Sequence, residues 1–246
     1  MRSHRVHCLL MGGQACVLYG AAEFSRDTDL AVLAEPDNLD RLHAAAEALE
    51  AEVIAVPPFE AAFLARGHAV HFRCGRADVA GMRIDVMARM RGVDPFPDLW
   101  KRRTTLEVAA EPGAEPIAID LLSLPDLVAA KKTQRDKDWP MIRRLLEASW
   151  FQFRDQATDI RVAFWLRELR TPELLTECVG GWPEAARALS PAREVVAAAR
   201  DGDLAGIDRA LAAEQARERE LDRAYWVPLR EELERLRHAR RDIGSA

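Results

Sequence analysis

The stretch Leu10-Met11-Gly12-Gly13-Gln14-Ala15, followed by Arg26-Asp27-Thr28-Asp29-Leu30, decides the fold of this chain. The apolar run from Val6 to Met11 predicts a strand that enters a tight turn at the two glycines. Gln14 to Tyr19 predicts a short helix, and Leu30 to Leu33 predicts a second strand. A glycine turn and an acid pair at neighbouring strand ends point to a site for metal and phosphate.

The rest of the first half alternates between helical and strand patterns. Leu39, Leu42, Ala46 and Leu49 recur at helical spacing and predict an amphipathic helix over 38–51. Short strands are expected at 53–56, 69–72, 82–87, 107–109 and 117–119, with a turn at 111–113 between the last two. We therefore expect an α/β (α+β) domain with a short mixed sheet over residues 1–120.

From about residue 123 onward the pattern is helical almost without strands. Ser123-Leu124-Pro125-Asp126 is a good helix start, with Ser123 as the N-cap. Helices are expected at 124–134, 140–148, 156–170, 172–179, 184–189, 191–201, 203–213 and 215–240. The sequence thus predicts an all-helical C-terminal domain over residues 121–246.

Three carboxylates are the candidate metal ligands. Side chains alternate across a strand, so Asp27 and Asp29 are expected on one face, where they repel each other unless a cation lies between them. Asp85 is the one acid in the apolar run from Met82 to Met87 and would supply a third ligand from another strand. Magnesium prefers such oxygen ligands and shares them with substrate phosphates. Two ions about 3.5–4 Å apart would suit transfer of a phosphoryl-type group.

Gly12 and Gly13 would supply the phosphate contact. Glycine lets the backbone approach a phosphate closely, and the following helix start offers free N–H groups. Each motif alone is weak, because lone Gly-Gly and Asp-x-Asp patterns are common. Their order along the chain makes the combination informative.

These motifs resemble those of the DNA polymerase beta-like nucleotidyltransferase superfamily, in particular its small bacterial branch that includes the abortive-infection toxin nucleotidyltransferases. The resemblance rests on the two opening stretches, on Arg83-Ile84-Asp85-Val86, and on Ser123 to Leu127 with Lys131-Lys132 and Arg135 to Asp138. It covers roughly the first 150 residues. Gly13 stands where many members have serine, and Arg26 and Thr28 replace commoner residues around the acid pair.

The resemblance implies transfer of a nucleoside monophosphate from a nucleoside triphosphate to an acceptor hydroxyl, with magnesium and release of pyrophosphate. Asp27, Asp29 and Asp85 would be the catalytic metal ligands. A second group of residues would bind the nucleotide: Gly12, Gly13, Arg26, Lys131, Lys132 and Asp138. The acceptor is left open between RNA, a protein and a small hydroxylated molecule. A toxin role and a cognate antitoxin partner are suggested by this branch alone.

Structural roles compete with several of these assignments. Asp27 and Asp29 could be turn acids, and Asp85 could form a salt bridge with Arg83 or Arg89. Lysines on a helix such as Lys131 and Lys132 are ordinarily exposed. Asp138 could cap the helix that follows.

Net charge, cysteine spacing and the length of apolar stretches indicate the kinds of partner and the cellular location to expect. The net charge of -5 gives no global attraction to nucleic acid or anionic membrane, although a local basic patch remains compatible with it. The four cysteines show no metal-ligand spacing, and no apolar stretch reaches membrane-spanning length, so we expect a cytoplasmic protein. The alternative function is a catalytically silent module on the same fold that binds nucleotide or a partner.

Overall fold

The computed structural model describes residues 1–109 and 113–244, and side chains up to residue 241. Contacts between Cα atoms divide the chain into two compact units. The first comprises 1–18, 22–130 and 224–246, and the second comprises 19–21 and 131–223. This division differs from the predicted domains 1–120 and 121–246, because the last helix contributes to both units.

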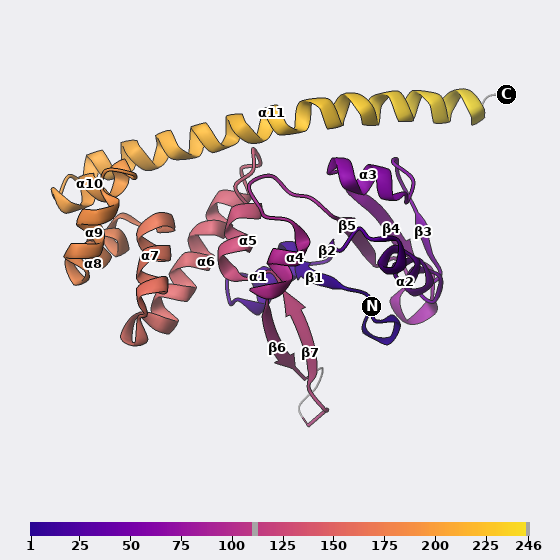
Figure 1. Cartoon of the computed structure of the whole chain (residues 1–246), viewed down its shortest axis with the longest axis horizontal. Helices are drawn as coiled ribbons and strands as arrows, with labels where there is room; N and C mark the ends of the chain where they lie inside the picture. Colours follow the sequence, from indigo (N-terminus) through magenta and orange to yellow (C-terminus); the bar gives the residue numbers. More distant parts are fainter. Residues whose placement is uncertain (110–112, 245–246) are drawn as a thin grey trace. The chain divides into compact units, whose positions relative to one another are not determined.

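The first unit contains a mixed sheet of seven strands in the order β3-β4-β5-β2-β1-β7-β6 (Figure 1). The strands are β1 (Cys8–Met11), β2 (Thr28–Val32), β3 (Ala51–Val53), β4 (Val70–Cys74), β5 (Arg83–Met87), β6 (Thr104–Val108) and β7 (Ile117–Leu121). β2–β5 and β1–β7 are parallel pairs, and the other neighbours are antiparallel. The α+β class and the mixed sheet are therefore confirmed.

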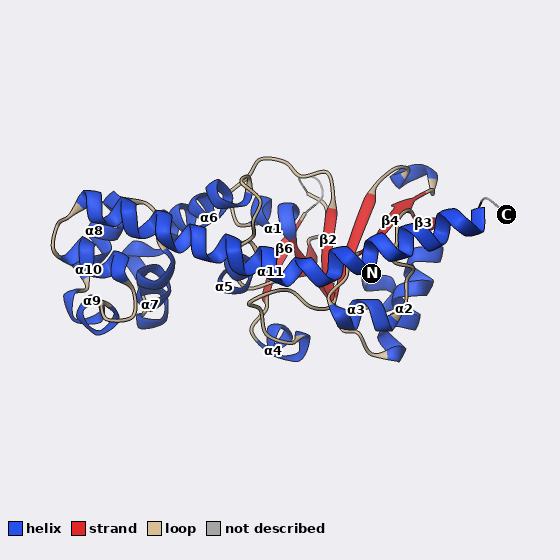
Figure 2. Ribbon diagram, turned by 90° about the horizontal axis from the view of Figure 1, so that it is seen from above, coloured by secondary structure: helices blue, strands red, loops and turns tan. Residues whose placement is uncertain are grey.

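The helices of the first unit are short. They are α1 (Gly12–Leu18), α2 (Pro36–Glu47), α3 (Ala61–Arg66), α4 (Phe96–Lys101) and α5 (Leu124–Ala130), with 3-10 turns η1 (Arg2–His4) and η2 (Ala77–Val79). α2 packs alongside β3 (Figure 2). Its buried Asn38 accepts from the His7 N–H at 2.7 Å and donates to Leu33 O at 2.8 Å, which fixes the helix start to the sheet.

Several predicted boundaries in this unit were wrong. The helix predicted over 38–51 begins at Pro36, whose fixed φ suits a first helical position. The strand predicted at 53–56 is Ala51–Val53. Helices α3 and α4 were missed because six residues give too little periodicity to recognise. The turn predicted at 111–113 falls largely outside the described residues.

Alternation of side chains builds the core beneath the sheet. Leu30, Phe72, Ile84 and Val86 lie on one face, and each is at most 5% exposed. At the start of α5, Ser123 is confirmed as a cap: the Asp126 N–H donates to Ser123 Oγ, and Asp126 accepts two hydrogen bonds from Arg102.

The second unit is helical, as predicted. It holds α6 (Asp138–Phe153), η3 (Arg154–Gln156), α7 (Asp159–Glu168), α8 (Pro172–Gly181), α9 (Pro183–Leu189), α10 (Glu194–Arg200) and the first part of α11 (Leu204–Gly244). Trp150, Trp165 and Trp182 form a tryptophan cluster with ring centroids 5.0–6.2 Å apart. Trp150 and Trp165 are at most 1% exposed, so this cluster is the centre of the helical core.

Helix α11 is continuous, whereas the sequence predicted two helices separated at residue 214. Glu214 is itself a good helix former, and its carboxylate forms ion pairs with Arg170 and Arg193 from neighbouring segments of the second unit. The later part of α11 belongs to the first unit, where Glu232 accepts from the buried His68 at 2.7 Å and pairs with Arg66 at 2.9 Å. The hydroxyl group of Tyr225, also on α11, lies where a Cβ atom of residue 67 would stand, so Gly67 is needed for this contact.

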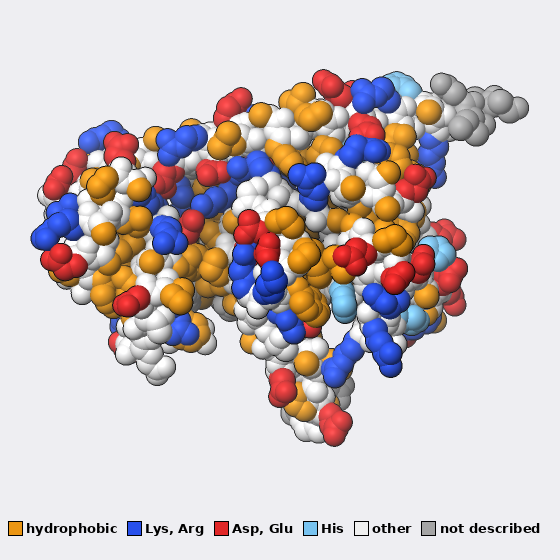
Figure 3. Space-filling model, viewed as in Figure 1, with side chains coloured by type: hydrophobic (Ala, Val, Ile, Leu, Met, Phe, Trp, Pro, Cys, Tyr) orange, Lys and Arg blue, Asp and Glu red, His pale blue; other side chains and the backbone are white. Residues whose placement is uncertain are grey.

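None of the helices in the described part of the chain combines the length and the apolar character that a membrane crossing requires. On the face drawn in Figure 3, acidic and basic side chains are interspersed, in keeping with the modest net charge of -5.

Candidate functional site

The sheet brings two of the three predicted acids together. Asp29 of β2 and Asp85 of β5 are directly paired residues on neighbouring parallel strands. Paired residues on adjacent strands project from the same face of a sheet, and the strands themselves lie about 4.8 Å apart. Ile84 and Val86 point to the buried face, so the two carboxylates lie on the opposite face.

The glycine turn lies directly against Asp29. Met11, the last residue of β1, is the antiparallel partner of Asp29, so Gly12 follows at the same place. A Cβ atom on Gly12 would overlap the Asp29 carboxylate, and Gly12 has a left-handed φ of +66°. The Gly13 N–H donates to Asp29 Oδ2 at 3.4 Å. Gly12 is thus required by the close approach of its backbone to the Asp29 carboxylate.

Ser25 occupies the space next to Gly13. A side chain at residue 13 would meet Ser25 Oγ, whose hydroxyl donates to Asp27 O at 3.4 Å. The loop before β2 therefore places a serine hydroxyl beside the turn, from a different position in the sequence.

Asp85 has a histidine and an arginine as neighbours on its own face of the sheet. His71 Nδ1 of β4 lies 2.8 Å from Asp85 Oδ1, and Arg83 Nη2 lies 3.4 Å from each carboxylate oxygen. Burial alone would raise the pKa of Asp85, but the contact with His71 and the charge of Arg83 outweigh it and hold this pKa below its ordinary value. Asp85 is therefore a carboxylate that stays ionised.

Asp27 and Arg26 precede β2 rather than lying within it. The strand begins at Thr28, so the predicted alternation of Asp27 with Asp29 along one strand does not hold. Arg26 is exposed in the same loop. Within 1–109 and 113–241, no three His, Cys, Asp or Glu side chains are grouped closely enough to hold a metal ion. The structure thus brings together Asp29 and Asp85, and leaves Asp27 at the edge of the site.

The predicted nucleotide-binding residues Lys131, Lys132 and Asp138 belong to the second unit. The two lysines follow α5, which ends at Ala130, so their predicted place on a helix was wrong. Lys131 Nζ lies 3.6 Å from Asp138 Oδ1, and Lys132 forms a 2.8 Å ion pair with Glu168.

Asp138 is the first residue of α6 and not its N-cap, which is Lys137. Its buried carboxylate accepts from Thr133 Oγ1 at 2.6 Å and from Arg135 Nε at 2.8 Å. Asp138 therefore organises the loop that carries the two lysines, and the predicted triphosphate contact of that loop stays a prediction.

The donor set fits magnesium in its chemistry. Two carboxylates on adjacent strands offer the oxygen ligands that this ion prefers, and the glycine turn lies directly against one of them. Asp29 and Asp85 would hold the ion, and Asp27 lies two residues before Asp29. Binding would compete with the contacts that His71 and Arg83 make to Asp85.

His71 is the residue of this site that the sequence analysis left out. The sequence pattern made it an ordinary strand residue between Val70 and Phe72, and its partner on β5 could not be known without the register. The pairing of His71 with Asp85 in an antiparallel ladder places the imidazole beside the carboxylate. The sequence offered one signal for this role: His71 stands between two apolar strand residues and therefore points to the face opposite theirs.

No family model matches the chain, and no curated protein matches it either.

Proposed function

We propose that this chain is a magnesium-dependent nucleotidyltransferase, which moves a nucleoside monophosphate from a nucleoside triphosphate to an acceptor hydroxyl. The observation that carries the proposal is the pairing of Asp29 with Asp85 beside the Gly12-Gly13 turn. The strand order β5-β2-β1 places Asp85 next to Asp29 and the glycine turn, although Asp85 lies more than seventy residues after that turn in sequence. Neither a surface salt bridge nor a solvated turn requires a glycine at position 12.

Each residue has a distinct part in this proposal. In the reaction, a bond forms between the acceptor oxygen and the α-phosphorus, and the bond from that phosphorus to pyrophosphate breaks. Magnesium, when bound, neutralises charge on the triphosphate. Asp29 and Asp85 hold the cation, and the backbone at Gly12 and Gly13 approaches the phosphates closely.

Asp85 acts as a ligand in this proposal rather than as a general base. A general base is most effective when its pKa is near the working pH, and the contacts of His71 and Arg83 hold the pKa of Asp85 below its ordinary value.

The test is release of pyrophosphate from each of the four ribonucleoside triphosphates with magnesium, offered total RNA and lysate protein as acceptors. Asp29→Asn and Asp85→Asn are expected to abolish release, because each removes a charged ligand while keeping the side-chain shape. Asp40→Asn is the matched control, since Asp40 is an exposed acid on α2. Full activity in Asp29→Asn and Asp85→Asn would overturn the proposal.

A catalytically silent binding module is the second candidate. It is favoured by the contacts of Asp85, whose carboxylate already lies against His71 and Arg83. Magnesium-dependent nucleotide binding without pyrophosphate release by the unaltered chain would favour this candidate. Growth arrest on expression, lost in Asp29→Asn, would test the toxin role.

A further inference from the structure

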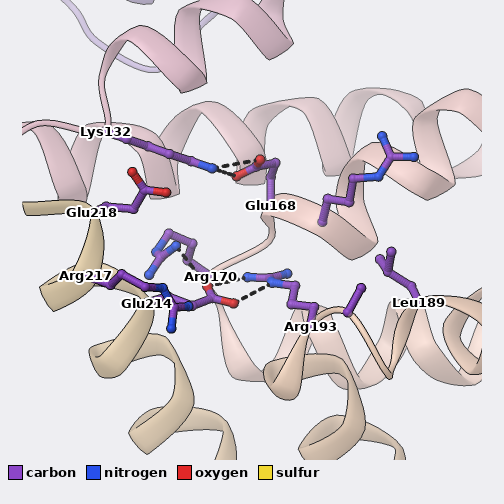
Figure 4. Close-up of a pocket in the computed structure, with 10 residues that line it drawn as sticks. Lys132, Glu168, Arg170, Leu189, Arg193, Glu214, Arg217 and Glu218 are labelled. Atoms are coloured by element: carbon purple, nitrogen blue, oxygen red, sulfur yellow. Dashed lines mark hydrogen bonds and ion pairs between the residues drawn. The ribbon is translucent and has the colours of Figure 1, made fainter. Parts of the chain in front are cut away.

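The second unit contains a cavity of about 360 Å³ that the proposed reaction does not use (Figure 4). Its walls come from the loop after α5, the end of α7, the segment before α10, and α11. The lining residues are Lys132, Arg167, Glu168, Arg170, Leu189, Ala192, Arg193, Glu214, Arg217 and Glu218. Five are cations and three are carboxylates, so the lining has two positive charges in excess although the whole chain has a net charge of -5.

Two buried guanidinium groups share one carboxylate in this cavity. The side chains of Arg170 and Arg193 are 9% and 8% exposed, and both pair with Glu214, at 3.3 and 2.9 Å. Arg193 also donates to Leu166 O and Leu169 O, and Arg170 donates to Leu211 O. Burial is the main cause that lowers the pKa of Arg170, against the attraction of Glu214.

Buried charge without a full counter-charge is costly, and this arrangement leaves one excess positive charge at the shared carboxylate. Figure 4 shows the Lys132–Glu168 pair facing the Arg193–Glu214 pair across the cavity. Glu168 and Glu218 also attract Arg170, but Glu168 is shared with Lys132, which lies 2.8 Å from it. An external anion would complete the network.

Arg167 and Arg217 are the cations best placed to meet such an anion. Both line the cavity and are exposed, and neither has an ion pair or hydrogen bond among the residues with described side chains. Guanidinium groups present planar pairs of N–H donors that match phosphate oxygens.

We infer that this cavity is a binding site for a small phosphate-bearing molecule. A phosphate monoester carries about two negative charges at neutral pH, which matches the excess of the lining. The volume is at the lower end for small-molecule sites, so it suits a compact metabolite rather than a polymer. The inference does not rest on the proposed nucleotidyl transfer, because every lining residue belongs to the second unit.

The experiment titrates the full chain with inorganic phosphate in a calorimeter, in the presence of a chelator and at fixed ionic strength. An Arg167→Ala/Arg217→Ala double variant is compared with Arg144→Ala/Arg187→Ala, which removes the same charge from exposed positions of the second unit outside the cavity. Saturable binding is expected in the unaltered chain and in the control. The cavity variant should bind roughly tenfold or more weakly, since each charged hydrogen bond contributes that much.

Two outcomes would overturn the inference. One is absence of saturable phosphate binding by the unaltered chain, including the case in which it binds single-stranded RNA or an acidic peptide instead. The other is equal affinity in both double variants. Phosphate binding that persists in Asp29→Asn/Asp85→Asn is expected, and it separates this site from the proposed catalytic one.

Discussion

Replacing Gly12 by alanine tests how closely the glycine turn and the Asp29 side chain are built against each other. Two separate costs are expected. Gly12 has a φ of +66°, a conformation that costs an L-residue about 1–2 kcal/mol. An added Cβ would also overlap the Asp29 carboxylate and approach Asp29 Cβ within 2.7 Å, and forcing such overlap costs about 1–3 kcal/mol.

Gly20→Ala is the matched control, because it isolates the first cost. Gly20 has a φ of +76°, and an added Cβ there would meet no atom within 4 Å. We therefore expect Gly12→Ala to lose about 1–3 kcal/mol more of the free energy of unfolding than Gly20→Ala. That difference is a large fraction of a typical total stability of about 5–15 kcal/mol.

Urea denaturation followed by circular dichroism measures both losses. A Gly12→Ala/Asp29→Ala double variant should recover part of the stability, since alanine at 29 removes the two nearest overlapping atoms, Oδ2 and Cγ, and leaves only the Cβ atom at 2.7 Å. Equal losses in Gly12→Ala and Gly20→Ala, or no recovery in the double variant, would refute the close contact on which the candidate site depends.

Three further predictions concern other contacts. His71→Ala should raise the pKa of Asp85 toward its ordinary value, and ¹³C NMR titration of the carboxyl group measures this change; an unchanged titration would contradict the His71 contact. Because the pKa of Asp85 is depressed in the folded state, its ionised form stabilises the fold at pH values above the unfolded-state pKa. This stabilisation is lost as the pH falls through the folded-state pKa. Glu232→Ala should lower the free energy of unfolding by about 1–3 kcal/mol, because it leaves the buried His68 without its carboxylate partner. Hydrogen exchange measures this loss, and we expect faster exchange confined to the later part of α11 and to α3. Trp165→Ala should cost about 3–5 kcal/mol from the tryptophan cluster, and a loss below 1 kcal/mol would contradict its central place in the helical core.

Long periodic segments were predictable from sequence, whereas short elements and pairings were not. The helices of the second half and the strands near 8–11, 28–32 and 83–87 could be predicted because the spacing of apolar residues within each element is enough to identify it. Helices α3 and α4 span six residues each, less than two turns, so no stripe can form. The residues around Glu214 in α11 are alanine, glutamine and arginine, all good helix formers, so helix propensity gave no support to the predicted break at this residue.

The candidate site was predictable in its residue types but not in its neighbours. Gly12, Asp29 and Asp85 could be selected because a glycine turn, an acid pair and an acid in a later apolar run follow one another in an informative order along the chain. The contact of His71 with Asp85 depends on the register of β4 against β5, which is set by the whole sheet. The cavity of the second unit also escaped prediction, because its residues come from four separate segments of the sequence.

During synthesis, the first unit is left incomplete for a long time. Its last segment, from residue 224 onward, leaves the ribosome only after residues 131–223, which takes roughly 5–20 s at about 5–20 residues per second. Until then His68 and the surface of α3 lack Glu232 and Tyr225, the groups that cover them in the finished protein. The nascent chain therefore presents a partly uncovered sheet unit to chaperones and proteases, and truncation at residue 223 would make that condition permanent.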